Sequence, residues 1–290
     1  MIIMEITQVA KIRGSQDGAI YGNELFRFNH RGDCAVYNLS DIGNSAIDEL
    51  APISLFTLGD TDKIVPHNNA VFFGCEFYDE SDEYPLLYTN VYNNYAKEED
   101  KKIGVCCVYR LQRLADGHMA KLVQIIEIGF TEDATLWKAY PDRHCTRPYG
   151  NFVIDKDKRA LYAFVMRDEE LGTRYFRFDM PSVHDGVLDS RYDVKKVVLD
   201  TSDIREYFDC GYHRFIQGAA LHNNKIYSTE GFHDDEINRP AIRIVDLDSK
   251  KEEYIDVMNM GFSNEPEFID FYNDVCYYSD APGNLYVIDF

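Results

Sequence analysis

The chain has 290 residues, of which 45% are hydrophobic, so it is long enough to bury a sizeable core. Its 50 acidic and 30 basic residues leave a net charge of −20, which disfavours nucleic acids and anionic membrane surfaces as partners. No apolar stretch approaches the length of a membrane-spanning helix.

A short pattern recurs five times along the chain. Residues 16–28 (QDGAIYGNELFRF) and 217–229 (QGAALHNNKIYST) align without a gap. Looser copies begin at three further residues, His67, Tyr149 and Glu265. A unit that returns roughly every 50–80 residues and is rich in Tyr and Phe is typical of the blades of a β-propeller.

The alternation of apolar and polar residues predicts the strands of each blade. Blade one has strands 18–22, 24–29, 33–39 and 53–58. Blade two has 69–74, 85–92, 104–113 and 119–129. Blade three has 151–155, 160–166, 173–179 and 194–199. Blade four has 217–222, 225–229, 240–247 and 252–258. Blade five has only three, 267–271, 274–279 and 284–289.

The N-terminal segment supplies the strand that blade five lacks. Residues 4–12 (MEITQVAKI) alternate as a strand and precede the first repeat. Pairing this strand with the last blade would close the ring and satisfy exposed strand edges. The sequence therefore predicts one all-β domain over residues 1–290, a five-bladed propeller with four strands in each blade.

Several segments fall outside the repeat. Residues 75–84, 93–102 and 130–148 are predicted as loops, and the first two are strongly charged. In the segment 200–215, Thr201 or Ser202 resembles a helix cap, which predicts a short helix near residues 204–208.

The repeat also names the candidate functional residues. In a propeller the first strand of each blade lines the central axis, so equivalent repeat positions form a ring there. This ring consists of Gln16, His67, Tyr149, Gln217 and Glu265. Other polar residues near the same strands are Asp17, Asn69, Arg147, Asn151, Arg214 and Glu267. Convergent amide, imidazole and carboxylate groups are typical of a pocket for a small polar molecule or a peptide.

Other interpretations of the ring stay open. The polar groups could simply bind channel water. A divalent ion such as Ca²⁺ on Glu265 and Glu267 is an alternative, although no cofactor is predicted and no H-x-x-x-H spacing indicates zinc. A glycoside hydrolase would use Asp17 with these two glutamates, but two carboxylates on one blade are poorly placed to flank a sugar bond.

Two stretches resemble the propeller-type glutaminyl cyclotransferases. Residues 215–231 (FIQGAALHNNKIYSTEG) resemble that family's Gln-Gly strand and the Tyr-containing strand after it. Residues 264–268 (NEPEF) resemble its Asn-Glu-x-Glu-aromatic motif. The resemblance implies a five-bladed fold and attack of an N-terminal glutamine amine on its own side-chain amide, with loss of ammonia.

The same resemblance implies a role for each residue. Glu265 or Glu267 would be the acid and base, because the reaction requires a carboxylate to move a proton. Gln217 and Tyr149 would position the substrate.

A protein–protein interaction scaffold that uses the loops at 75–102 and 130–148 is the competing class of function. The seven cysteines form no C-x-x-C pair, and no basic leader precedes an apolar run near the N-terminus. We therefore expect reduced thiols and a cytoplasmic location.

Overall fold

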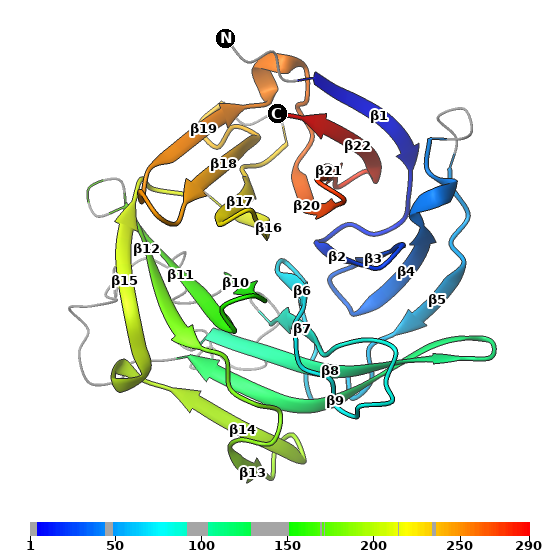
Figure 1. Ribbon diagram of the computed structural model, residues 1–290. Coiled ribbons are helices and arrows are strands. Elements are labelled where there is room, and N and C mark those ends of the chain that lie inside the picture. The colour runs from blue at the N-terminus through cyan, green and yellow to red at the C-terminus, as the bar shows by residue number, and fades with distance from the viewer. Residues whose placement is uncertain are drawn as a thin grey trace.

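The computed structural model describes residues 5–43, 49–91, 104–128, 151–168, 170, 172–213, 215–233 and 236–290, without the side chains of 166–168. Within this part of the chain, five sheets form a ring around a central axis (Figure 1). Each sheet runs from an inner strand near the axis to an outer strand at the rim. The predicted five-bladed β-propeller is therefore confirmed.

The strands follow the predicted order closely. Blade one contains β2 (Gly18–Tyr21), β3 (Glu24–Phe28), β4 (Asp33–Asn38) and β5 (Ser54–Thr57). Blade two contains β6 (Val71–Phe73), β7 (Leu87–Asn90), β8 (Gly104–Leu114) and β9 (Gly117–Ile128). Blade four contains β16 (Ile216–His222), β17 (Lys225–Glu230), β18 (Ala241–Asp246) and β19 (Glu252–Asp256).

Blade five is completed by the N-terminal strand, as predicted. Its strands are β20 (Pro266–Tyr272), β21 (Val275–Asp280), β22 (Asn284–Asp289) and β1 (Glu5–Lys11). The strand β1 pairs antiparallel with β22, from Glu5 opposite Asp289 to Lys11 opposite Asn284. The two ends of the described chain thus share one sheet, which removes two exposed strand edges.

Blade three differs from the prediction in its outer strand. The blade contains β10 (Asn151–Asp155), β11 (Ala160–Asp168), β12 (Gly172–Asp179) and β15 (Ile204–Cys210). The segment predicted as its fourth strand is β14 (Val194–Leu199), which instead pairs in parallel with β9 of blade two. With β13 (Val187–Asp189) on its far side, β14 extends blade two to six strands.

The prediction of a short helix near residues 204–208 is also wrong, because these residues form a strand. Thr201–Asp203 form a 3-10 turn, η3, which is capped by Asp200 rather than by Thr201 or Ser202. The residues after it form β15, in which exposed and more buried side chains alternate with a period of two and Phe208 faces the core. Pairing with β12 therefore outweighs the local helix signal.

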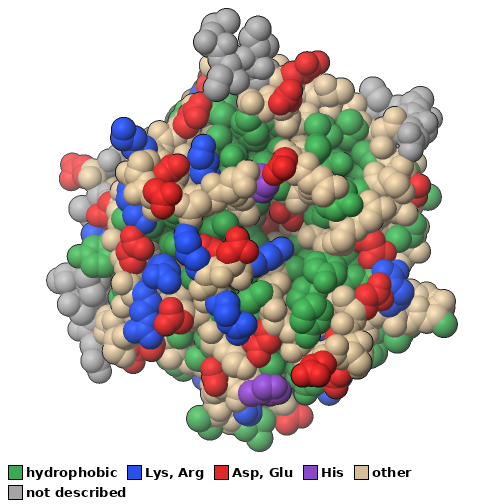
Figure 2. Space-filling model, in the orientation of Figure 1, with side chains coloured by type: hydrophobic (Ala, Val, Ile, Leu, Met, Phe, Trp, Pro, Cys, Tyr) green, Lys and Arg blue, Asp and Glu red, His purple; other side chains and the backbone are tan. Residues whose placement is uncertain are grey.

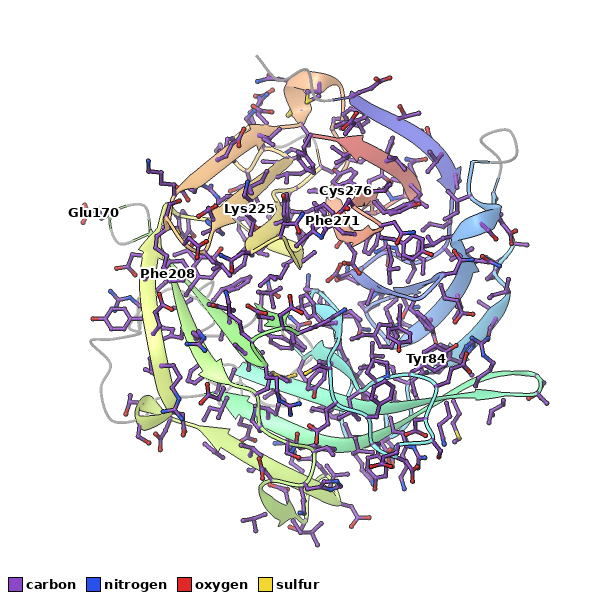
Figure 3. The ribbon with its side chains drawn as sticks, in the orientation of Figure 1. Tyr84, Glu170, Phe208, Lys225, Phe271 and Cys276 are labelled. Carbon is purple, nitrogen blue, oxygen red and sulfur yellow. The ribbon has the colours of Figure 1, made fainter. Side chains whose placement is uncertain are left out.

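Hydrophobic side chains fill the spaces between neighbouring blades. One core cluster joins blades one and two through Phe26, Phe73 and Tyr109. Another joins blades four and five, where the ring of Phe271 stacks on that of His222 at 4.1 Å (Figure 3). This packing holds the inner strands in fixed positions around the axis.

Tight turns keep successive strands in register. Asn223 and Asn224 have φ angles of 48° and 59° in the hairpin between β16 and β17. Asn tolerates this left-handed conformation, as the paired turn of a two-residue hairpin requires. Among the described residues, the helices are short 3-10 turns, and none is long and apolar enough to cross a membrane.

Candidate functional site at the propeller axis

The structure brings together the predicted axial residues that it describes. The inner strands β2, β6, β10, β16 and β20 begin around one end of the axis, and the predicted residues lie at or just before these beginnings. Asn69 of blade two donates a hydrogen bond from Nδ2 to Oε1 of Gln217 of blade four, at 3.1 Å. Gln217 then donates from Nε2 to Oε1 of Glu265, at 2.5 Å.

A second set of amides closes the axis on the side of blade three. Asn90, on β7, donates from Nδ2 to Oδ1 of Asn151 at 2.7 Å. Asn151 donates in turn to the backbone oxygen of Ile216 at 2.8 Å. These bonds link blades two, three and four, and both Asn side chains are buried.

Asp17 and Glu267 form the floor of this site. Asp17 is fully buried and accepts a hydrogen bond from the backbone N–H of Val71 at 3.0 Å. Glu267 is 3% exposed, and Nε2 of Gln16 lies 3.5 Å from its Oε1. A Cβ atom on Gly218 would lie 3.0 Å from Oδ1 of Asp17 and 2.7 Å from the backbone oxygen of Glu267, so only glycine fits here. Blades one, four and five therefore approach one another closely at Asp17.

Arg27 is the residue that sequence reasoning missed. It comes from β3, the second strand of blade one, and its side chain is fully buried. The guanidinium donates to the backbone oxygens of Gln16 and Gly14 and lies over the ring of Phe268 at 4.9 Å. The signal was an arginine in the otherwise apolar run LFRF, directly opposite Gly18, whose missing side chain leaves room for it.

The electrostatics of the floor follow from burial. Desolvation raises the pKa values of Asp17 and Glu267 well above their usual range, and the neighbouring Glu265 raises that of Glu267 further. Burial also raises the pKa of the half-buried Glu265. Desolvation lowers the pKa of Arg27 to about 10, against the attraction of Asp17 and Glu267. The carboxyl groups here hold protons more readily than exposed ones do.

Several polar atoms at this site have no hydrogen-bond partner within the described part of the chain. They are Oε1 of Gln16, Oδ1 of Asp17, Oδ1 of Asn69, Oε2 of Glu267 and Nε of Arg27. Four of these five atoms are oxygens, so the site offers mainly hydrogen-bond acceptors. Buried polar atoms are usually paired, and a concentration of unpaired ones is typical of a position that a ligand or water fills.

The remaining predicted residues lie beside this network or beyond the described chain. His67 is partly buried, its backbone N–H donates to the backbone oxygen of Asn90 at 2.9 Å, and its ring lies 6.3 Å from that of His30. Arg147, Tyr149 and Arg214 lie outside the described residues. Much of the two loops at 75–102 and 130–148 also lies outside them.

The described residues do not form a metal site by themselves. Within the ranges given above, no group of three or more His, Cys, Asp or Glu side chains is arranged to hold a metal ion. Glu265 binds the amide of Gln217 instead of sharing a position with Glu267. Acidic, basic and histidine side chains gather around the centre of the face shown in Figure 2.

Comparison with known proteins leaves the activity open. No protein-family model and no curated protein matches the chain. Among solved structures, it is similar to virginiamycin B lyase from Staphylococcus aureus, with a TM-score of 0.41, 11% identity and 99% of both chains covered. BamB from Moraxella catarrhalis gives a TM-score of 0.34 and 11% identity over 98% of this chain, which spans 62% of BamB. The computationally designed protein Ika8 gives a TM-score of 0.36 and 10% identity.

Proposed function

We propose that the protein recognises a small polar ligand, rich in hydrogen-bond donors, at the mouth of the propeller axis. The observation that carries this proposal is the set of buried acceptor oxygens without partners on Gln16, Asp17, Asn69 and Glu267. A ligand with amine or amide N–H groups would satisfy such oxygens. Three of these four side chains are almost completely buried, so leaving their oxygens unpaired is unfavourable.

The side chains of this site differ in exposure, and we take the more exposed ones as its mouth. Gln217 is 7% exposed, whereas Gln16 and Glu265 are only partly buried. A ligand would therefore meet Glu265 and Gln217 first, with Glu267 beneath them. Because Asp17 is fully buried below, a sugar chain has no access to it, which argues against the glycoside hydrolase alternative.

Acid–base chemistry at the same mouth is a second candidate, and the raised pKa of Glu265 favours it. A carboxyl group whose pKa approaches the working pH can both give and take a proton. In the cyclotransferase-like reaction, the amine nitrogen of an N-terminal glutamine would attack the side-chain amide carbon. The C–N bond to the amide nitrogen would then break, and ammonia would leave with the transferred proton.

The experiment is a binding screen with a matched pair of variants. The probes are glutamine, glycinamide, ethanolamine and glucose, measured by thermal shift and then by calorimetry. We expect an amine or amide probe to stabilise the wild type, and Glu265→Gln to weaken its binding at least tenfold. Glu253→Gln, which changes an exposed carboxylate on β19, should leave binding unchanged.

Two results would contradict this function. One is that none of the three amine or amide probes stabilises the wild type, and the other is that binding survives both Glu265→Gln and Gln217→Ala. If loop deletions instead release a co-purifying protein, the interaction scaffold is the better function. Ammonia release from a peptide with N-terminal glutamine, lost in Glu265→Gln, would separate catalysis from binding alone.

A further inference from the structure

A cavity lies at the junction of blades four and five. It measures about 310 Å³ and is bordered by β1, by the loop at residues 261–264 and by β21 and β22. Its volume is near the lower end of the range for ligand pockets, about 300–1,000 Å³. A cavity of this size fits a small molecule or a single head group.

Three aromatic rings surround this cavity. The ring of Phe262 meets that of Tyr286 at 5.1 Å and 89°, so these two form walls at right angles. The ring of Tyr278 lies 5.8 Å from that of Tyr286, with an angle of 48° between their planes. Aromatic faces carry a negative quadrupole and attract organic cations.

A buried carboxylate adds a negative charge to the same cavity. Asp280 is 3% exposed and accepts hydrogen bonds from Asn264 Nδ2, from the backbone and side chain of Asn284, and from the Tyr286 hydroxyl. All of these donors are neutral groups. Within the described chain, no Lys or Arg lines the cavity. The carboxylate of Asp280 is therefore hydrogen-bonded by neutral groups, and the buried Arg27, which does not line the cavity, interacts with its charge from outside.

The hydrogen bonds that Asp280 already accepts indicate which kind of cation would suit this cavity. A primary ammonium would seek acceptors for three N–H groups, but the oxygens of Asp280 already accept four hydrogen bonds. A quaternary ammonium needs no acceptor and gains only from charge and from aromatic faces. This cavity offers both of those, and the carboxylate of Asp280 has little accepting capacity left.

The hydroxyl of Tyr278 is the second indication of a ligand. Tyr278 is 1% exposed and lines the cavity, yet its hydroxyl has no hydrogen-bond partner within the described residues. Tyrosine hydroxyls are normally paired when they are buried. An oxygen atom on the ligand, close to its cationic group, would supply the missing partner.

We propose that this cavity binds the quaternary ammonium group of a small organic cation. Phe262, Tyr278 and Tyr286 form the aromatic walls, and Asp280 supplies the opposite charge. The hydroxyl of Tyr278 bonds an oxygen carried by the same ligand. The site shares no ligand-facing residue with the mouth of the axis, so it stands independently of the function proposed there.

The test compares three probes by calorimetry on the full chain. Choline carries both the cation and an oxygen, tetramethylammonium carries only the cation, and 3,3-dimethyl-1-butanol is the neutral counterpart of choline. We expect choline to bind at least tenfold more tightly than the neutral alcohol. Tyr278→Phe should weaken choline several-fold and leave tetramethylammonium unchanged, because only choline has an oxygen for the hydroxyl.

Substitutions inside and outside the cavity test whether the cations bind there. Phe262→Ala removes one wall from a partly exposed loop and should weaken both cations at least tenfold. Phe77→Ala, in an exposed position on blade two, should change neither. The proposal is overturned if neither cation binds, if the neutral alcohol binds as tightly as choline, or if Phe262→Ala has no effect.

Discussion

The junction of blades one and two and the junction of blades four and five hold cavities of nearly equal size, about 300 Å³ and 310 Å³, each beside a buried tyrosine. At the first junction, the hydroxyl of Tyr84 donates to Glu24 at 2.6 Å and lies 3.1 Å from Nε2 of His118 (Figure 3). Arg113 also bonds this hydroxyl and forms a bidentate pair with Glu83. At the second junction, the hydroxyl of Tyr278 has no partner in the described chain, and no arginine lines the cavity.

The two junctions use the same residue types differently, one to hold blades together and the other with polar groups left unpaired. Where an arginine joins the carboxylates and the tyrosine, the polar groups satisfy one another and hold two blades together. Where the arginine is missing, charge and hydrogen-bonding capacity remain for something else. A count of partners, rather than the kind of residue or the size of the cavity, distinguishes a structural junction from a candidate binding site.

The largest expected effect concerns the most deeply buried arginine. Arg27→Met should lower the free energy of unfolding by about 3–5 kcal/mol, because it removes buried hydrogen bonds and leaves Asp17 and Glu267 without a nearby cation. Arg113→Met, whose wild-type side chain is 40% exposed, should cost no more than about 1 kcal/mol. Urea unfolding of both variants gives this comparison, and equal losses would contradict it.

A smaller loss of stability should distinguish Tyr84→Phe from Tyr278→Phe. Tyr84→Phe removes a hydroxyl with three partners and should cost about 1–3 kcal/mol. Tyr278→Phe removes a hydroxyl without a recorded partner and should stay within about 0.5 kcal/mol of the wild type. Both are the same chemical change in buried positions, so each serves as the control of the other. A Tyr278→Phe variant as unstable as Tyr84→Phe would show that its hydroxyl has a structural partner after all.

A further effect is a dependence of stability on pH. Burial raises the pKa of Asp17 above 3.8 and that of Glu267 above 4.5, so the folded state binds protons that the unfolded state has released. Their contribution is complete below those unfolded values and is lost as the pH rises through the folded ones. Unfolding measured from pH 5 to pH 8 should therefore show a steeper decline for the wild type than for Glu267→Gln.

The expected slope is at most about 1.4 kcal/mol per pH unit for each proton. The exposed variant Glu253→Gln should reproduce the wild-type curve. Identical curves for Glu267→Gln and the wild type would mean that this carboxyl does not titrate differently on folding.

Much of the fold could be predicted because blades repeat. The inner three strands of every blade and the closing strand depend on local alternation and on turns such as Asn223–Asn224, which a sequence displays directly. The position of Val194–Leu199 could not be predicted in this way, since its pattern fits the edge of either neighbouring sheet. Which edge it joins is decided by the parallel pairing with β9, a contact between distant segments.

The candidate site likewise has residues that the repeat predicts and residues that it does not. Gln217 and Glu265 were found because they occupy equivalent repeat positions, and Asn69 because it lies two residues after such a position. The structure joins all three by hydrogen bonds. Arg27 was missed because the ring was taken from first strands alone, whereas its side chain reaches the axis from a second strand. The cavity at Tyr278 depends on how β1 and a loop meet blade five, and no repeat position marks it.

The excursion of the chain through β14 ties blades two and three together. The chain leaves blade three after β12, runs in parallel with β9 from Lys195 opposite Gln124 to Leu199 opposite Ile128, and returns as β15. Blade three therefore cannot be excised, exchanged or duplicated as a self-contained module, since its last strand follows a segment that belongs to its neighbour. Separating blade two from blade three would require breaking the backbone hydrogen bonds between β14 and β9. A junction held by side chains alone would separate without that loss.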